Sequence, residues 1–413
     1  MDALNPGLGA GNNTRAMSSM DHELMRDLVD LKSAGLHRSL RPVEFNSGTT
    51  IEVGGRKVLN FASNDYLGLS RHPMVMESTA KAVRDWGAGS TASRLICGSL
   101  KPHHLLEEQL SAWKGTPACL TFSSGYAAAL GTIPALVGSG DIVIIDKRVH
   151  ACCVDAARLS GATLRVFRHN DLSSLEWILK WARRGVNSKE NPRVLIITES
   201  VFSMDGDLAP LRDIVEMKDR HGAWLMLDEA HALGLFGANR SGLAHALDLS
   251  NRIEVQMGTL GKALGSSGGY IAGSRILIDL LIQRARSLMF STAPSPAATA
   301  GALAAIQVVE SEEGKVRSEK AWSNALQISN QLNLPQMPTS TIVPIILGSE
   351  QAAVDASQSL YEAGFWVPAI RYPTVAKGAA RLRLSFSATQ DKEHINSLVI
   401  PLRSICTTCR TLT

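Results

Sequence analysis

Short apolar runs that alternate with helix signals fill the chain from residue 118 to residue 228, and they constrain the fold more than any other feature. The runs at 118–122, 142–145, 194–198 and 223–227 have the length and character of strands that are buried on both faces. Between them, Asp171 and Pro210 each stand ahead of leucines and isoleucines at helical spacing. Strands that alternate with helices through short loops form right-handed βαβ units. The sequence therefore predicts an α/β fold with a mostly parallel central sheet.

Further helices and strands are expected in the sequence before and after the segments that form this sheet. An amphipathic helix begins at Asp21 and stops near Gly35, and a hairpin surrounds the glycine pair at 54–55. After the sheet, strands at 342–347 and 365–370 flank a helix at 351–363. The clearest strand is 382–387, because it alternates strictly. Its apolar residues face a core and its polar residues face the other way: Leu382, Leu384 and Phe386 against Arg383 and Ser385.

The composition shifts near residues 291–296, and an alanine-rich helix follows at 297–310. We therefore expect three parts. Residues 1–60 form a tail, a helix and an arm, residues 61–296 a large domain, and residues 297–413 a smaller C-terminal α+β domain.

Composition narrows the class of protein. The chain has 413 residues, of which 45% are hydrophobic and 19% charged, as in soluble globular proteins. A net charge of +4 is too small over this length to indicate a nucleic-acid partner, although it is compatible with an anionic substrate. No apolar stretch has the length of a membrane span, and residues 1–20 lack the apolar segment of a secretory signal. We therefore expect no membrane association.

The six cysteines lack the spacing of a disulfide framework, which favours a reducing compartment, and we expect the cytoplasm. Cys406 and Cys409 form a lone C-x-x-C pair at the end of the chain. A zinc site would need two more ligands nearby, so we assign no metal.

Two residues with complementary chemistry follow strand-like runs. Asp228 ends the run at 223–227, and Lys262 lies among glycines after the run at 253–257. Ligands of open α/β sheets bind at the carboxyl ends of strands, so the two side chains can meet in one crevice. Such a pair suits pyridoxal phosphate (PLP), because the lysine can form a Schiff base while the carboxylate keeps the pyridine nitrogen protonated. Taken alone, an aspartate at a strand end is usually a turn or helix cap, and a lone lysine in a glycine-rich loop is usually solvated.

Two phosphate-binding motifs are excluded for this lysine. A P-loop needs Gly six residues before the lysine and Ser or Thr after it, whereas Gln256 and Ala263 occupy these positions. A dinucleotide fingerprint is also absent, since no G-x-G-x-x-G opens a helix after a strand.

Other residues fit the same crevice. Ser124, Gly125 and Tyr126 lie between a strand end and a helix start, where free N–H groups bind anions, and Thr259 can add a hydroxyl to the same phosphate. His150 and His231 also follow strands and can contact a planar ring. Arg383 offers a planar fork for a substrate carboxylate. Each has an ordinary structural interpretation when it is considered alone.

Together these residues resemble a known family, the α-oxoamine synthases, which are PLP-dependent transferases of fold type I. The resemblance runs from about Arg38 to about Leu402. It rests on the segments 63–69, 93–98, 124–126, 169–171, 199–207, 228–231 and 259–265. Segments 369–375 and 380–384 resemble the branch that joins alanine to a pimeloyl thioester. The chain departs from the family at Ala129, where an Asn is usual, and after His231, where many relatives carry a small polar pair.

The resemblance implies roles by position. Lys262 would form the Schiff base, Asp228 would pair with the pyridine nitrogen, and His150 would stack on the ring. The other cofactor contacts would come from Gly125, Tyr126, Ser203, His231, Thr259 and Thr292. The substrates would be bound by Arg38, Asn64, Arg371, Thr374 and Arg383, the last holding the amino-acid carboxylate. Thr292 would reach the phosphate of a neighbouring subunit, which implies a homodimer with shared active sites.

The implied activity is the decarboxylative condensation of L-alanine with pimeloyl-CoA or a pimeloyl carrier protein, on the route to biotin. An alternative within the family joins glycine to acetyl-CoA, and the context of Cys97 resembles that branch. The two other activities of the family, those of 5-aminolevulinate synthase and of sphingolipid-type serine palmitoyltransferase, fit the sequence less well. An alternative of a different class is a non-catalytic protein with this fold that binds partners.

Overall fold

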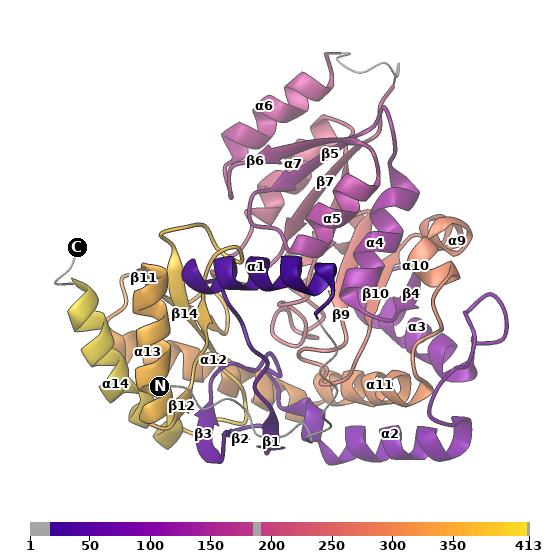
Figure 1. Cartoon of the computed structure of the whole chain (residues 1–413). Coiled ribbons are helices and arrows are strands. Elements are labelled where there is room, and N and C mark those ends of the chain that lie inside the picture. Colours follow the sequence, from indigo (N-terminus) through magenta and orange to yellow (C-terminus); the bar gives the residue numbers. More distant parts are fainter. Residues whose placement is uncertain (1–16, 185–190, 411–413) are drawn as a thin grey trace.

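The computed structural model describes residues 17–184 and 191–410. Its first part consists of a helix in which no residue is buried, followed by three short strands (Figure 1). Helix α1 (Ser19–Ser33) begins two residues before the predicted start, because the Ser18 hydroxyl accepts a hydrogen bond from Asp21 N and caps the helix at 3.1 Å. Strands β1 (Val43–Asn46), β2 (Thr50–Val53) and β3 (Arg56–Asn60) follow. β2 and β3 form the predicted hairpin.

The central sheet has seven strands in the order β4-β10-β9-β8-β7-β5-β6. Only β10 runs antiparallel to its neighbours, so the predicted, mostly parallel sheet is confirmed. The bounds are β4 (Ala118–Phe122), β5 (Ile142–Asp146), β6 (Thr163–Phe167), β7 (Val194–Glu199), β8 (Trp224–Asp228), β9 (Val255–Thr259) and β10 (Gly269–Gly273). β6 and β10 were not predicted from the sequence.

Helices cover both faces of this sheet (Figure 1). Alternate residues of one strand enter different cores: Leu195 and Ile197 of β7 pack in one cluster, and Val194 and Ile196 in the other. The helices of this region are α2 (Pro73–Trp86), α3 (Lys101–Lys114), α4 (Gly125–Leu136), α5 (Ala151–Leu159), α6 (Leu172–Ala182), α7 (Leu211–Arg220), α8 (Leu243–Ala246), α9 (Arg275–Arg284), α10 (Arg286–Met289) and α11 (Pro296–Glu310). Asp171 caps α6 as predicted, since its carboxylate accepts a hydrogen bond from Ser174 N.

A smaller, antiparallel sheet has the strand order β11-β14-β13. It lies beside the helices of the C-terminal part of the chain (Figure 1). Its elements are α12 (Glu312–Leu332), β11 (Ile342–Gly348), α13 (Glu350–Glu362), β13 (Ala369–Ile370), β14 (Ala380–Ser385) and α14 (Lys392–Arg410). The predicted single strand at 365–370 is wrong. Its first half is β12 (Phe365–Trp366), which pairs with β3, and its second half is β13, which pairs with β14. The smaller α+β unit is nevertheless confirmed.

The division into domains stays a prediction. The helix after the expected boundary, α11, packs against α2 and α3 and contributes to the core of the large sheet. A separate core joins Phe61 to α12, α14 and the small sheet. Among the described residues, no helix is long and apolar enough to cross a membrane.

Candidate active site

The carboxyl ends of the parallel strands meet at one edge of the large sheet, and the predicted cofactor residues other than Thr292 lie there. They come from the ends of five strands or from the segments that follow them: Gly125 and Tyr126 after β4, His150 after β5, Ser203 after β7, Asp228 and His231 at and after β8, and Thr259 and Lys262 at and after β9. This is the edge at which open α/β sheets bind ligands. Asp228 and Lys262 meet at this edge, since the charge of each acts on the pKa of the other. That they line one ligand crevice stays a prediction.

Lys262 belongs to a chain of polar side chains. Its Nζ lies 2.8 Å from His231 Nε2, and His231 Nδ1 lies 2.6 Å from the Tyr66 hydroxyl. Burial lowers the pKa of Lys262 from its usual value, although the nearby Asp228 opposes this shift. Burial, together with the charge of Lys262, lowers the pKa of His231 well below its usual value. The surroundings thus favour a neutral imidazole and raise the fraction of neutral amine, which is the state in which a lysine can act as a base or a nucleophile.

Asp228 is buried at the end of β8, with 5% of its surface exposed. Its Oδ1 accepts a hydrogen bond from Ala230 N at 2.9 Å. Within the described ranges, no hydrogen bond reaches Oδ2. Burial raises the pKa of Asp228, and the charge of Lys262 lowers it. A carboxylate with one oxygen fixed and the other uncommitted fits the protonated nitrogen of a pyridine ring.

Glu199 is a second carboxyl group at this edge, and we assigned it no role from the sequence. It ends β7 and is the register partner of Asp228. Its two oxygens accept hydrogen bonds from His150 N at 2.6 Å and Ser203 N at 3.2 Å. Burial, then the charge of Asp228, raises the pKa of Glu199 to about 8. The signal was present, because Glu199 follows the apolar run at 194–198 as Asp228 follows its own run.

The turn into α4 has the features of an anion site. Ser124 caps the helix by accepting a hydrogen bond from Ala127 N at 3.0 Å. This leaves the first N–H groups of the helix, those of Gly125 and Tyr126, without a partner in the described part of the chain. A Cβ on Gly125 would lie 3.7 Å from the Thr259 Cβ, so the start of α4 adjoins the end of β9 at this turn. The turn therefore fits a phosphate group.

The hydroxyl groups of two predicted cofactor residues already have partners within the chain. The Thr259 hydroxyl donates to Gly268 O at 3.0 Å. The Tyr126 hydroxyl donates to Asp155, and the side chain of Tyr126 is exposed. Both roles stay predictions.

Arg383 is buried on β14, with 5% of its surface exposed, so the polar face of this strand is not solvated. Its Nε donates to Ser203 O at 2.5 Å, and its Nη1 donates to Asn64 Oδ1 at 3.1 Å and Ser385 Oγ at 2.7 Å. Its Nη2 makes one long contact, 3.4 Å from the Tyr66 hydroxyl. Of the five N–H groups of the guanidinium, one on Nη2 has no partner among the residues that the structure describes. This group lies beside the chain formed by Tyr66, His231 and Lys262 and can receive a carboxylate.

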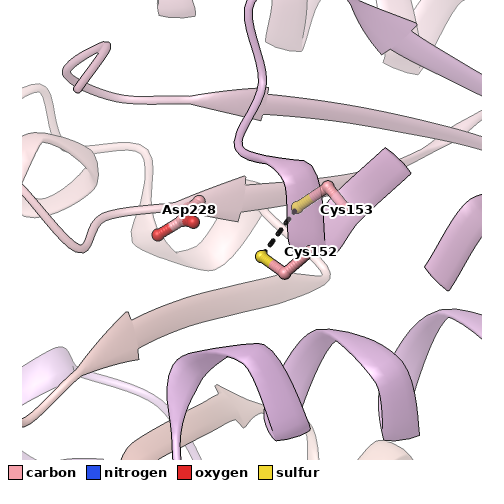
Figure 2. Close-up of side chains that lie close together, drawn as sticks. All are labelled: Cys152, Cys153 and Asp228. Carbon is pink, nitrogen blue, oxygen red and sulfur yellow. Dashed lines mark hydrogen bonds between the residues drawn. The ribbon is translucent and has the colours of Figure 1, made fainter. Parts of the chain in front are cut away.

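His150 caps α5 and is followed by two adjacent cysteines, to which we assigned no site role from the sequence. Its Nδ1 lies 3.0 Å from the Cys152 sulfur, and the sulfurs of Cys152 and Cys153 are 4.0 Å apart. Figure 2 shows both cysteines at the start of α5, opposite Asp228 at the end of its strand. A hydrogen bond from Cys153, and another with His150, lowers the pKa of Cys152 to about 6, although burial opposes the shift.

The predicted substrate residues outside this crevice form a second group. Arg38 Nη2 donates to Tyr372 O at 3.1 Å, and Arg371 Nη1 donates to Gly35 O at 2.6 Å. Thr374 N donates to Arg371 O at 3.0 Å, so it belongs to the same group. No hydrogen bond between described residues joins these side chains to Lys262 or Arg383. Thr292 is exposed on the segment between α10 and α11 and also lies outside the Lys262 chain.

Sequence comparisons are consistent with this geometry. The model of the family described as aminotransferase class I and II matches residues 56–400. The chain is 46% identical to an 8-amino-7-oxononanoate synthase of Maricaulis maris, over 96% of this chain and 98% of the relative. It is 45% identical to a protein of the same name from Anaeromyxobacter dehalogenans, over 92% of this chain and 94% of the relative.

Among solved structures, the serine palmitoyltransferase of S. paucimobilis with PLP and myriocin bound has a similar fold. The TM-score is 0.87 and the sequence identity is 27%, over 96% of this chain and 100% of that chain. The likeness extends over both the large and the small sheet regions, since nearly the whole chain is covered.

Proposed function

The chain belongs to the aminotransferase class I and II family, and we propose that it condenses L-alanine with pimeloyl-CoA, or with a pimeloyl carrier protein. The products are 8-amino-7-oxononanoate, CO2 and the free thiol, and the pathway is that of biotin. The observation that carries this proposal is the 46% identity to an 8-amino-7-oxononanoate synthase over nearly the full length of both chains. The fold is that of the PLP-dependent transferases of fold type I.

The residues of the crevice fit PLP. Lys262 would hold the cofactor covalently, the free oxygen of Asp228 would face the ring nitrogen, and the N–H groups at the start of α4 would face the phosphate. Ser203 and His231 would lie near the phenolic oxygen, with His150 on the face of the ring. When bound, PLP supplies an electron-accepting ring that stabilises negative charge at the Cα of the amino acid.

Lys262 is suited to take the Cα proton of alanine at its Nζ. Burial lowers the pKa of Lys262, which raises the fraction of neutral amine. The hydroxyl of Tyr66 adjoins His231 Nδ1, and if it donates there, the neutral ring carries its hydrogen on Nε2. That hydrogen can then be donated to the lone pair of Lys262 Nζ, 2.8 Å away. This arrangement would keep the amine oriented between proton transfers.

Arg383 would bind the carboxylate of alanine through Nη2. Its position is fixed by Ser203 O, Asn64 and Ser385, so the guanidinium is ordered before substrate arrives. Asn64 would therefore act by holding Arg383. The carboxylate is the group that leaves as CO2 after the carbon–carbon bond to the acyl group has formed.

Arg38, Arg371 and Thr374 would bind the acyl thioester. The guanidinium groups of Arg38 and Arg371 join two segments more than 330 residues apart in the sequence. Because Arg38 is exposed and Arg371 only partly buried, they can meet a large anionic substrate at the surface.

A homodimer with shared active sites completes the proposal. Ala293 N donates to Ala92 O at 2.9 Å, and near this contact Ile96 and Phe290 are 79% and 69% exposed. A second copy would cover such apolar side chains and bring Thr292 to its neighbour's phosphate site. Sedimentation should show a dimer for the natural chain and a monomer for Phe290→Asp, and a natural chain that sediments as a monomer would contradict this part. The free Cys97, Cys119, Cys152 and Cys153 support a cytoplasmic location.

The test is a substrate screen with product identification by mass spectrometry. Alanine, glycine and serine are each combined with pimeloyl-CoA, acetyl-CoA and palmitoyl-CoA, with Lys262→Ala as the inactive control. We expect the highest kcat/KM for alanine with pimeloyl-CoA. A preference for glycine with acetyl-CoA would replace this function with the glycine alternative. PLP binding without turnover of any pair would favour a non-catalytic protein.

A further inference from the structure

Two adjacent thiols face a carboxylate inside the crevice, and the proposed reaction uses only the carboxylate. Ligand atoms of Cys152, Cys153 and Asp228 all lie within 4.8 Å of one another. All three side chains are buried, with 1%, 0% and 5% of their surfaces exposed. The cysteines come from the first turn of α5 and the aspartate from the end of β8, so two rigid elements hold the group (Figure 2).

The spacing of these atoms suits a soft divalent metal ion. Zn²⁺ binds thiolate sulfur at about 2.3 Å in tetrahedral geometry, which places two bound sulfurs about 3.8 Å apart. The sulfurs of Cys152 and Cys153 are 4.0 Å apart, so both can bind one ion with small shifts. Thiolates select zinc-like ions over Mg²⁺ and Ca²⁺, which require oxygen ligands.

The surroundings also favour the thiolate form of Cys152, which is the form that binds a metal ion. The cysteines lie at the N-terminus of α5, where the helix dipole favours thiolates over thiols. His150 Nδ1, 3.0 Å from the Cys152 sulfur, can accept the thiol hydrogen. The opposing charge is Lys262, which interacts electrostatically with Asp228.

The geometry points to a site for one soft divalent metal ion, held by the sulfurs of Cys152 and Cys153 and a carboxylate oxygen of Asp228. A fourth position is left for water. The ion would bind the carboxylate that the proposed function assigns to the pyridine nitrogen. Metal and PLP therefore compete for Asp228. The competition rests on the proposed function, whereas the metal site does not.

The test uses the full-length chain, freed of cofactor and carrying Cys406→Ser and Cys409→Ser, so that the terminal C-x-x-C pair cannot bind the probe. Cadmium chloride is titrated while the thiolate-to-cadmium charge-transfer band is followed in the ultraviolet. Zinc chloride is then added to displace the cadmium, and magnesium chloride serves as the hard-ion control. Variants in this background are Cys152→Ser, Cys153→Ser and Asp228→Asn, with Cys97→Ser as the matched control. Thermal melting identifies the variants that are folded.

We expect one Cd²⁺ per chain, displaced by Zn²⁺ and unaffected by Mg²⁺. Cys152→Ser and Cys153→Ser should each weaken binding by at least about 100-fold, since the loss of a group that merely supports a metal ligand already costs about 10- to 100-fold. Asp228→Asn should weaken binding but keep the charge-transfer band, and Cys97→Ser should change neither. The proposed site is wrong if the chain that carries only Cys406→Ser and Cys409→Ser shows no charge-transfer band. It is also wrong if the band survives in folded Cys152→Ser and Cys153→Ser variants.

The competition is measured by PLP absorbance in the same chain with and without bound Cd²⁺. Cadmium should raise the apparent Kd for PLP in proportion to its own occupancy. If Cd²⁺ binds the two sulfurs and the Kd for PLP is unchanged, the competition is wrong. Failure of the metal-free chain to bind PLP would instead count against the proposed function and leave the metal result intact.

Discussion

Glu199 and Asp228 are register partners at the carboxyl ends of β7 and β8, and both carboxyl groups are buried. Two carboxylates that share a buried site cannot both ionise freely. The charge of Lys262 opposes the rise in the pKa of Asp228, and the pKa of Glu199 rises to about 8. We infer that the pair holds one proton near neutral pH and that Glu199 carries it, which leaves Asp228 charged.

This relationship predicts how stability depends on pH. Between the usual pKa of 4.5 and about 8, the folded chain keeps a proton on Glu199 that the unfolded chain has lost. The contribution of Glu199 to the free energy of unfolding is therefore fully present below about pH 4.5. It is lost as the pH rises through about 8. Glu199→Gln should flatten this decline, which urea unfolding of the cofactor-free protein at several pH values can measure.

Glu199→Gln should also cost about 1–3 kcal/mol at the acidic end, because an amide cannot accept the hydrogen bonds of both His150 N and Ser203 N through oxygen. If the free energy of unfolding declines with pH as steeply in the variant as in the natural chain, Glu199 is not the residue that carries the proton.

Asp228→Asn tests the electron sink. The variant should keep PLP attached, since Lys262 is intact, but an amide does not hold the ring nitrogen protonated. We expect kcat to fall by on the order of 10²–10⁴. The measurement combines cofactor absorbance with steady-state rates, and normal turnover in a PLP-loaded variant would contradict the role of Asp228.

Arg383→Lys tests the carboxylate site. An ammonium group cannot reproduce the planar fork that Ser203 O, Asn64 and Ser385 hold in place. We expect KM for alanine to rise by about 10- to 100-fold, which corresponds to about 1.4–2.7 kcal/mol, while KM for the thioester changes little. Arg381→Lys is the control, because Arg381 lies on the same strand and pairs with Asp205 at 2.6 Å. An equal rise of KM for alanine in both variants would show a general effect on β14.

Tyr66→Phe tests the hydrogen-bonded chain behind Lys262. Loss of the hydroxyl leaves His231 Nδ1 without a partner, and we expect kcat to fall about tenfold, as for one buried hydrogen bond. Tyr270→Phe is the matched control, because the buried Tyr270 hydroxyl has no hydrogen-bond partner among the described residues. Equal rates in the two variants would show that the hydroxyl of Tyr66 does not position His231.

The parallel sheet could be predicted because strands buried on both faces appear as continuous apolar runs, as at 194–198 and 223–227. The split of 365–370 could not. β12 pairs with β3 and β13 pairs with β14, and strand pairing between distant segments leaves no trace in six residues of local sequence. The side chains of Cys406 and Cys409 lie outside the described residues.

The same contrast holds for the site. Asp228 and Lys262 could be brought together because both follow strands of one sheet. Tyr66 could not, since it reaches His231 across 165 residues from a loop with no strand-end signal. For Arg383, alternation along 382–387 predicted its face of the strand but not its burial, because the groups that cover that face come from the loops at Asn64 and Ser203.

The central claim is that Lys262 is the residue that holds PLP in the crevice beside Asp228. The most direct measurement is borohydride reduction of the purified PLP-loaded chain, followed by peptide mass spectrometry. The account predicts one pyridoxyl-phosphate adduct, on the peptide that contains Lys262, and its loss in Lys262→Ala. An adduct on another lysine of the natural chain, or none at all in protein that has bound PLP, would contradict it.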